Sequence, residues 1–180
     1  VKVINQIFQT LVRVDPADVD RLVPELATAW QVSPDGLELI FTLRAGVIFH
    51  DGAALDAAAV KLSLDRVRKV GFELPSAPYA SEFNFIEALA AEGLTLGIRL
   101  KQPVARIALR NLSMFCASIV SPKVLLLAQS LSPAEGSAYV SQHAAGTGPF
   151  QVDAFDPAAK VTRLVAFEGA WQRAAHVRAL

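Results

Sequence analysis

The sequence predicts an α+β fold, in which a small antiparallel sheet or meander with several short helices is followed by a second β-hairpin. Apolar and polar residues alternate over 37–43 and over 94–100, which is the pattern of half-buried strands. Between them, Val60, Leu64 and Val67 recur at i, i+4 and i+7, which is helical spacing. Helix and strand patterns that follow one another in this way favour an α+β architecture.

The N-terminal third is expected to contain a short helix, a helical turn and the meander. Apolar residues recur at helical spacing over 4–14, before an Asp-Pro pair that stops a helix. One more helical turn is expected at 24–27. The Ser-Pro-Asp-Gly run at 33–36 predicts a β-turn between two strands, because proline presets φ and glycine relieves the last turn position. Further turns at 44–46 and 50–52 extend the hairpin into the meander.

The middle of the chain is expected to be mainly helical. Asp56 stands at the N-cap position of the clearest helix, whose charged residues at 61–69 form a solvated face. A second helix is expected over 83–91, before the strand 94–100 that Pro103 closes.

The C-terminal third is expected to turn from helices to strands. Ser121 and Ser132 each precede a proline, which is a helix start signal, and the second also has a glutamate at the capping-box position. After Gly-Thr-Gly-Pro at 146–149, alternation on both sides of an Asp-Pro turn at 156–157 predicts the second hairpin.

Composition excludes several classes of protein. The 17 basic and 17 acidic residues give zero formal net charge and form no basic stripe, so nucleic acid is not an expected partner. The longest apolar run, 124–128, is far shorter than a membrane span, so the chain is not expected to be transmembrane. Cys116 has no second cysteine to pair with and is expected to pack in the core. The segment 1–14 lacks the pattern of a signal peptide and indicates a piece cut from a longer protein.

Five ordered blocks of sequence carry a resemblance to a known family. Residues 22–36, from Leu-Val-Pro-Glu-Leu-Ala to Ser-Pro-Asp-Gly, and residues 41–52 resemble the opening blocks of family 5 extracellular solute-binding proteins, the dipeptide, oligopeptide and nickel-binding group. The helix at 60–67, Ile-Val-Ser-Pro-Lys at 119–123 and Gly-Thr-Gly-Pro-Phe at 146–150 resemble later blocks in the same order. The chain departs from the family where Ala-Trp-Gln-Arg at 170–173 replaces a usual Tyr-Trp-Gly-Gly run.

The resemblance implies a two-lobed clamp, two to three times longer than this chain, that closes on a solute. On that basis residues 1–145 are expected to be the accessory subdomain of the first lobe. Residues 146–180 would begin the main subdomain of that lobe, and the second hairpin would belong to its main sheet.

The implied function is that of a fragment of a periplasmic peptide-binding protein that captures peptides for an ABC importer. The implied partners are a peptide or other small solute, held together with the missing second lobe, and an ABC permease in the membrane. The implied location is periplasmic, or extracytoplasmic and membrane-anchored. Two alternatives stay open: another solute on the same scaffold, such as a nickel chelate, haem, an opine or an oligosaccharide, or a sensor or interaction module not coupled to transport.

No catalytic residue, metal site or cofactor is expected. His50, His143 and His176 do not have the spacing of a helical zinc site, and no Gly-x-Ser-x-Gly elbow is present. His50 with Asp51 forms an acid–base pair in one interpretation and a turn with an amide-capping aspartate in the other.

The candidate ligand-binding residues are Gly146, Thr147 and Gly148, in a turn expected close to the ligand cleft. The alternative is a tight crossover that needs glycine for backbone conformation alone. A phosphate loop would require a lysine and a wider glycine spacing. Four further residues could contact a ligand, but packing or salt bridges explain them more simply: Trp30, Arg44, Arg66 and Trp171.

Overall fold

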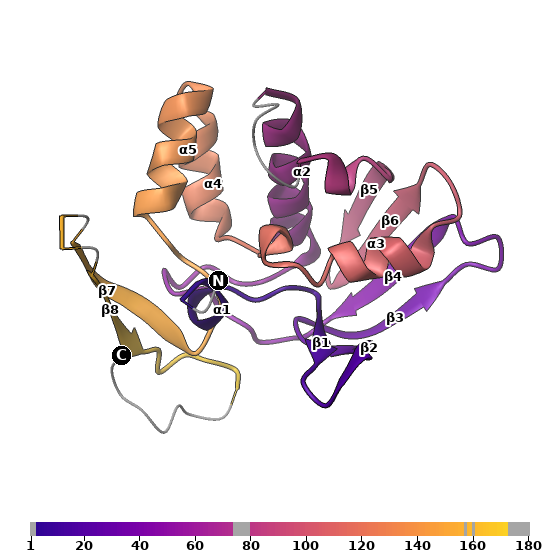
Figure 1. The fold of residues 1–180 in the computed structure, drawn as a ribbon, viewed down its shortest axis with the longest axis horizontal. Helices are drawn as coiled ribbons and strands as arrows, with labels where there is room; N and C mark the ends of the chain where they lie inside the picture. The colour runs from indigo at the N-terminus through magenta and orange to yellow at the C-terminus, as the bar shows by residue number, and fades with distance from the viewer. Residues whose placement is uncertain (1–2, 74–79, 157, 160, 173–180) are drawn as a thin grey trace. The chain divides into compact units, whose positions relative to one another are not determined.

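The computed structural model describes residues 3–73, 80–156, 158–159 and 161–172 (Figure 1). The chain divides into two compact units, each built from separate segments of sequence. Unit 1 comprises residues 1–9, 46–55 and 120–180, and unit 2 comprises residues 10–45 and 56–119. The expected α+β class is confirmed, with small antiparallel sheets and several helices.

Unit 2 contains a four-stranded antiparallel sheet in the order β3-β4-β6-β5. Its strands are β3 (Ala27–Val32), β4 (Glu38–Leu43), β5 (Ile86–Glu92) and β6 (Thr95–Leu100). Leu39, Phe41 and Leu43 are buried while the residues between them are more exposed, as the alternation predicted. The β3–β4 turn is the predicted one: Gly36 has φ of 72°, and its N–H donates to the carbonyl of Ser33 at 2.9 Å.

Helix α2 (Ala57–Glu73) lies against the β5–β6 side of this sheet (Figure 1). Its predicted cap is confirmed, because the Asp56 carboxylate accepts a hydrogen bond from the N–H of Ala59 at 2.7 Å. Val60 and Leu64 are buried, as their spacing predicted, whereas Val67 is only half-buried. The rest of unit 2 is formed by shorter elements: β1 (Val12–Asp15), β2 (Asp18–Pro24), η1 (Ala80–Phe83), α3 (Ala105–Asn111) and η2 (Phe115–Ala117).

Two helical predictions for the N-terminal segment were wrong. Helix α1 (Ile4–Ile7) ends within the first turn of the expected helix 4–14, and β1 pairs with β2 instead. The expected helical turn at 24–27 is also absent: β2 ends at Pro24 and β3 begins at Ala27, and the N–H groups of Glu25 and Ala27 donate to the carbonyl of Leu11. Pairing of the backbone with a neighbouring strand therefore overrides the local helical spacing.

The expected helix over 83–91 was wrong as well, because most of that segment forms strand β5. Its alanines, leucine and glutamates are good helix formers, but an edge position beside β6 supplies backbone partners that the local sequence does not reveal. The predicted meander also changes: residues 47–49 form only a single bridge, between Ile48 and Ala54, and β6 lies next to β4.

Unit 1 contains the helices α4 (Pro122–Gln129) and α5 (Pro133–Gln142) and the hairpin of β7 (Phe150–Asp156) with β8 (Val161–Ala166). Both predicted serine caps are present, and the second forms a complete capping box. The hairpin is confirmed, although Pro157 of its turn lies outside the described residues. Ile7, Phe150 and Leu164 form the buried core under this hairpin.

The compact units do not follow the expected domain boundary between residues 145 and 146. Residues 1–9, 46–55 and 120–145 group with 146–180 rather than with the rest of 1–145. The assignment of 1–145 and 146–180 to subdomains of one lobe stays a prediction.

Candidate functional site

The predicted ligand turn lies between α5 and β7, and all three of its residues are buried. A Cβ added to Gly146 would lie 2.1 Å from the carbonyl oxygen of Ile7, and one added to Gly148 would lie 2.3 Å from that of Gln6. The N–H of Gly148 also donates to the carbonyl of Ile7 at 2.9 Å. Glycine is required at both positions because the N-terminal segment approaches the turn backbone too closely for any side chain.

His50 binds both ends of this turn. The N–H of Gly146 donates to Nδ1 at 3.3 Å, and Nε2 lies 2.9 Å from the carbonyl oxygen of Gly148. The backbone N–H of His50 donates to the carbonyl of Gly146 at 2.9 Å. The ring of Phe167 meets the imidazole edge-on, with centroids 4.8 Å apart. Burial lowers the pKa of His50 from its ordinary value.

Thr147, between the two glycines, is held through Gln9. The Thr147 hydroxyl donates to Oε1 of Gln9 at 2.9 Å, and Nε1 of Trp171 donates to the same oxygen at 2.8 Å. Thr147 and Gln9 are 1% and 3% exposed, so their hydrogen bond is shielded from water. Trp171 therefore anchors the turn through Gln9 in this structure.

The proposed acid–base pair of His50 with Asp51 is not formed, because both ring nitrogens bind the 146–148 turn. The Asp51 carboxylate accepts hydrogen bonds from the N–H of Ala53 and from the hydroxyl of Ser121, and the Asp51 carbonyl accepts one from Nζ of Lys123 at 2.8 Å. Asp51 thus caps a local amide, as the turn interpretation held.

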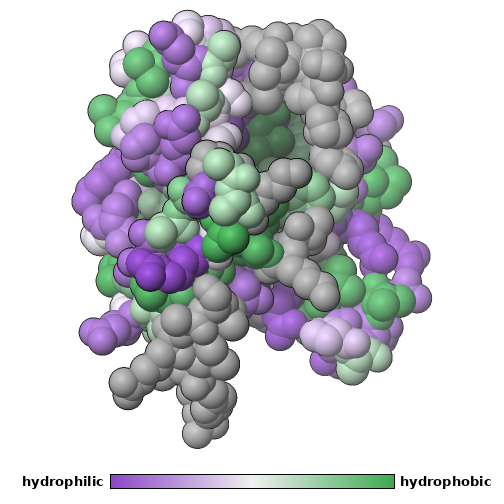
Figure 2. Space-filling view, turned by 60° about the vertical axis from the view of Figure 1, so that its left-hand side comes forward, coloured by the Kyte–Doolittle hydropathy of each residue, from purple (hydrophilic) through white to green (hydrophobic). Residues whose placement is uncertain are grey.

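A hollow of about 680 Å³ lies beside this site in unit 1, and no sequence pattern predicted it. Its polar lining includes His50 and Lys123, and its apolar lining includes Phe155, which is 59% exposed. The rings of Tyr139 and His143 stack on its helical side with centroids 3.8 Å apart. On the face shown in Figure 2, hydrophobic and hydrophilic residues are intermixed.

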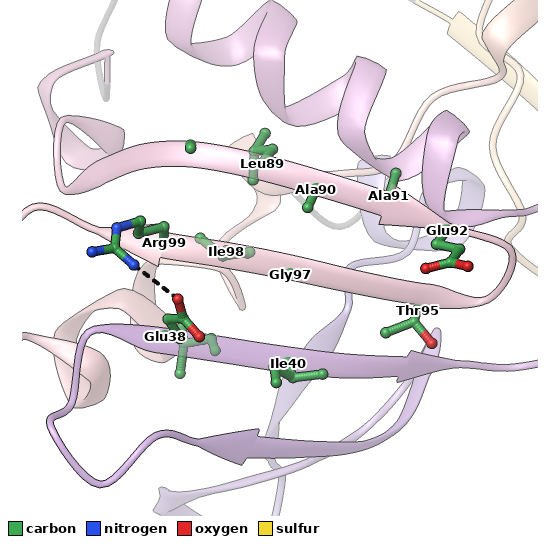
Figure 3. A pocket seen from close by; sticks show the side chains of 12 residues that line it. Glu38, Ile40, Leu89, Ala90, Ala91, Glu92, Thr95, Gly97, Ile98 and Arg99 are labelled. Atoms are coloured by element: carbon green, nitrogen blue, oxygen red, sulfur yellow. Dashed lines mark hydrogen bonds and ion pairs between the residues drawn. The ribbon is translucent and has the colours of Figure 1, made fainter.

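A second hollow, of about 490 Å³, lies on the outer face of the sheet in unit 2. Gly97 of β6 pairs with Ala90 of β5, and the small size of both residues leaves room for the hollow. Figure 3 shows Glu38 and Arg99 joined at one end, with a distance of 2.9 Å, and Glu92 and Thr95 at the other. The hollow could not be predicted from the sequence, because residues 83–91, which include Ala90, were expected to form a helix.

The other candidate residues occupy packing positions. Nε of Arg44 donates to the carbonyl of Glu25 at 3.3 Å, and Trp30 pairs with Phe41 across β3 and β4. Burial lowers the pKa of the Arg66 guanidinium and raises that of the Cys116 thiol. Cys116 is partly rather than fully buried.

The part of the chain that the structure describes holds no group of three or more His, Cys, Asp or Glu side chains placed to bind a metal ion. Its helices also fall short of the length and hydropathy needed to cross a membrane. His176 lies outside the described residues.

Residues 21–180 match the family model of the bacterial extracellular solute-binding proteins, family 5 Middle. The chain belongs to this family. Its sequence blocks, expected from residues 22–36 onward, fall within the matched range. The resemblance drawn from the sequence is confirmed.

Two curated relatives are named for the ligand that they bind. The glutathione-binding protein of Salmonella paratyphi A is 33% identical over 148 residues, which cover 82% of this chain and 27% of the relative. The probable D,D-dipeptide-binding periplasmic protein of Escherichia coli is 33% identical over 71% of this chain and 23% of its own length. The chain thus spans about a quarter of the length of these relatives.

Solved structures of other solute-binding proteins share the fold. An ABC transporter-associated periplasmic binding protein of Helicobacter pylori, in complex with the peptide STSA, has a TM-score of 0.79 at 26% identity. NikZ of Campylobacter jejuni, in complex with Ni(L-His), has a TM-score of 0.80 at 26% identity. The alignments cover 97% and 98% of this chain but 36% and 33% of those proteins.

Proposed function

We propose that the chain is part of an extracytoplasmic solute-binding protein that captures peptides for an ABC importer and carries out no chemistry. The family match over residues 21–180 is the observation that carries this proposal. It is supported by two relatives whose names state a peptide ligand, glutathione and a D,D-dipeptide. A permease in the membrane would be the partner, as in an importer, and the location would be periplasmic or membrane-anchored outside the cytoplasm.

The solute would be held by more protein than this chain provides. The structures that share its fold are about three times longer. In the proposed arrangement the turn 146–148 lies near the ligand cleft and frames it, while a second lobe closes on the solute. The burial of Gly146, Thr147 and Gly148 and their hydrogen bonds within unit 1 support a framing role.

A second candidate is a different small solute on the same scaffold. It is favoured by two solved structures at 26% identity, one in complex with Ni(L-His) and the other with agropinic acid. The two candidates differ in the ligand only, and both require closure around it.

Calorimetry would test the function and separate the two candidates. This chain and the full-length protein that contains it would each be titrated with short peptides, glutathione, nickel–histidine and an opine. We expect the full-length protein to bind peptides and the 180-residue chain to bind them weakly or not at all. Binding of only the nickel complex or the opine would favour the second candidate. Micromolar peptide binding by this chain alone would contradict the proposed division of the site.

A further inference from the structure

We propose that His50 is a positioning residue that holds the turn 146–148 in its observed conformation only as the neutral imidazole, so that acidification releases the turn. This inference goes beyond the proposed function, because it concerns the scaffold and holds for any solute.

The hydrogen bonds at the ring determine its protonation. The N–H of Gly146 can only donate, so Nδ1, at 3.3 Å, must accept and therefore carries no proton. The carbonyl of Gly148 can only accept, so Nε2, at 2.9 Å, must carry the proton. The arrangement thus requires one tautomer of the neutral ring. A proton added at Nδ1 would face the N–H of Gly146 and remove its acceptor.

The turn has few ways to adjust to that change. Gly146 and Gly148 pack directly on the carbonyl groups of Ile7 and Gln6, so the turn cannot move toward the N-terminal segment. Phe167 lies against the imidazole and restricts rotation of the ring. Loss of the Nδ1 acceptor should therefore displace the turn and leave the imidazole ring in place.

Ionisable groups surround His50 on several sides. Burial lowers the pKa of His50, and this effect exceeds those of the hydrogen bond to Gly148 and of the neighbouring Asp51 carboxylate, which both favour the protonated ring. The segment from Val3 to Gln9 contributes no ionisable side chain. Among the residues that the structure describes, five further ionisable groups border the hollow or flank Phe167: Lys123, Tyr139, His143, Asp153 and Glu168. Asp153 is paired with Arg163.

The sign of the pH effect follows from the lowered pKa. An ordinary histidine titrates near pH 6.5, and in the folded chain His50 takes up its proton at lower pH. The unfolded chain thus binds the proton first as the pH falls. The stabilisation is complete above about pH 6.5 and is lost as the pH falls through the pKa of the folded state.

Nuclear magnetic resonance of the 180-residue chain tests the proposal directly. At pH 7.5 the ring nitrogens of His50 are expected to show the proton on Nε2. As the pH falls toward 5, protection of the Gly146 amide from hydrogen exchange, corrected for the intrinsic rate, should fall about tenfold in step with ionisation of His50. A proton on Nδ1 at pH 7.5, or Gly146 protection that does not change when the ring ionises, would overturn the proposal.

Two variants provide the matched comparison. His50→Gln removes the ionisable ring and should abolish the pH step in Gly146 protection. His143→Gln removes another histidine of the same hollow, whose ring stacks on Tyr139 and whose Nδ1 lies 2.9 Å from the carbonyl oxygen of Tyr139, and should leave the step unchanged. Persistence of the step in His50→Gln would contradict the proposal. If that variant does not fold, the ring-nitrogen spectrum of the unmodified chain still decides the outcome.

Discussion

Thr147 and Trp171 donate hydrogen bonds to the same atom, Oε1 of Gln9, although they lie 138 and 162 residues from it in the sequence. Gln9→Met keeps the size of the side chain but deprives both donors of this acceptor. We expect it to lower the free energy of unfolding by about 1–3 kcal/mol, since the buried Thr147 hydroxyl would lose its acceptor. Urea denaturation measures the loss.

A double-mutant cycle provides the control for that prediction. Thr147→Val removes one of the two donors, so Gln9→Met should cost about 1 kcal/mol less in the Thr147→Val background than in the native chain. Additive costs for the two substitutions would show that the shared oxygen is not their point of contact.

Alanine at either glycine of the turn is expected to destabilise unit 1 strongly. The added Cβ of Gly146→Ala or Gly148→Ala would lie within 2.1 or 2.3 Å of a backbone oxygen, and backbone cannot move aside as a side chain can. We expect a loss of at least about 2 kcal/mol for each, measured by denaturant unfolding. The matched control is Gly97→Ala, whose Cβ would meet nothing nearer than 3.6 Å, with an expected change within about 0.5 kcal/mol.

Glu25→Gln is expected to become more favourable relative to the native chain as the pH rises. Desolvation raises the pKa of Glu25, whose Oε2 accepts hydrogen bonds from the N–H and hydroxyl of Thr10, each at 2.8 Å. A raised pKa means that the stabilisation is complete below the ordinary value of 4.5 and is lost as the pH rises through the pKa of the folded state. Glutamine does not ionise, so its stability contribution does not change with pH. The difference in melting temperature between Glu25→Gln and the native chain should therefore grow from pH 4 to pH 8.

Glu25→Ala is the control, because it removes the acceptor as well as the charge. It should cost about 1–3 kcal/mol at pH 4, where the native carboxyl is protonated. Parallel pH curves for the native chain and Glu25→Gln would contradict the stated effect of burial.

Asp56→Ala should shorten or loosen the start of α2. The substitution removes the acceptor for the N–H of Ala59 and is expected to cost about 1 kcal/mol. Asp56→Ser retains a capping oxygen and should cost only a few tenths. Equal losses for alanine and serine, measured by thermal unfolding, would indicate that the charge rather than the hydrogen bond matters.

Features with local causes were predicted correctly from the sequence. The turn at 33–36, the cap at Asp56 and the capping box at Ser132 each depend on residues a few positions apart, so a single sequence contains the full signal. Strand β5 was predicted to be helical because its residues favour a helix, whereas the backbone partner that makes it a strand belongs to β6.

The candidate site was predictable in part for the same physical reason. Glycines at 146 and 148 indicated a backbone with special requirements, and the structure identifies these as close approaches to Gln6 and Ile7. The contact of His50 with Gly148 joins residues 98 positions apart, and no periodicity or motif marks it. The sequence therefore located the turn but not the side chain that holds it.

The discontinuous make-up of unit 1 has a consequence for the folding kinetics. Gln6 and Ile7 contact residues about 140 positions later in the sequence, whereas the paired strands β3 and β4 are separated by a short turn. Closing such a long loop lowers the entropy of the chain before stabilising contacts form. The high contact order of unit 1 should therefore make it fold more slowly than unit 2. During synthesis, residues 3–9 would lack these partners until the segment around Gly148 and Trp171 had been made.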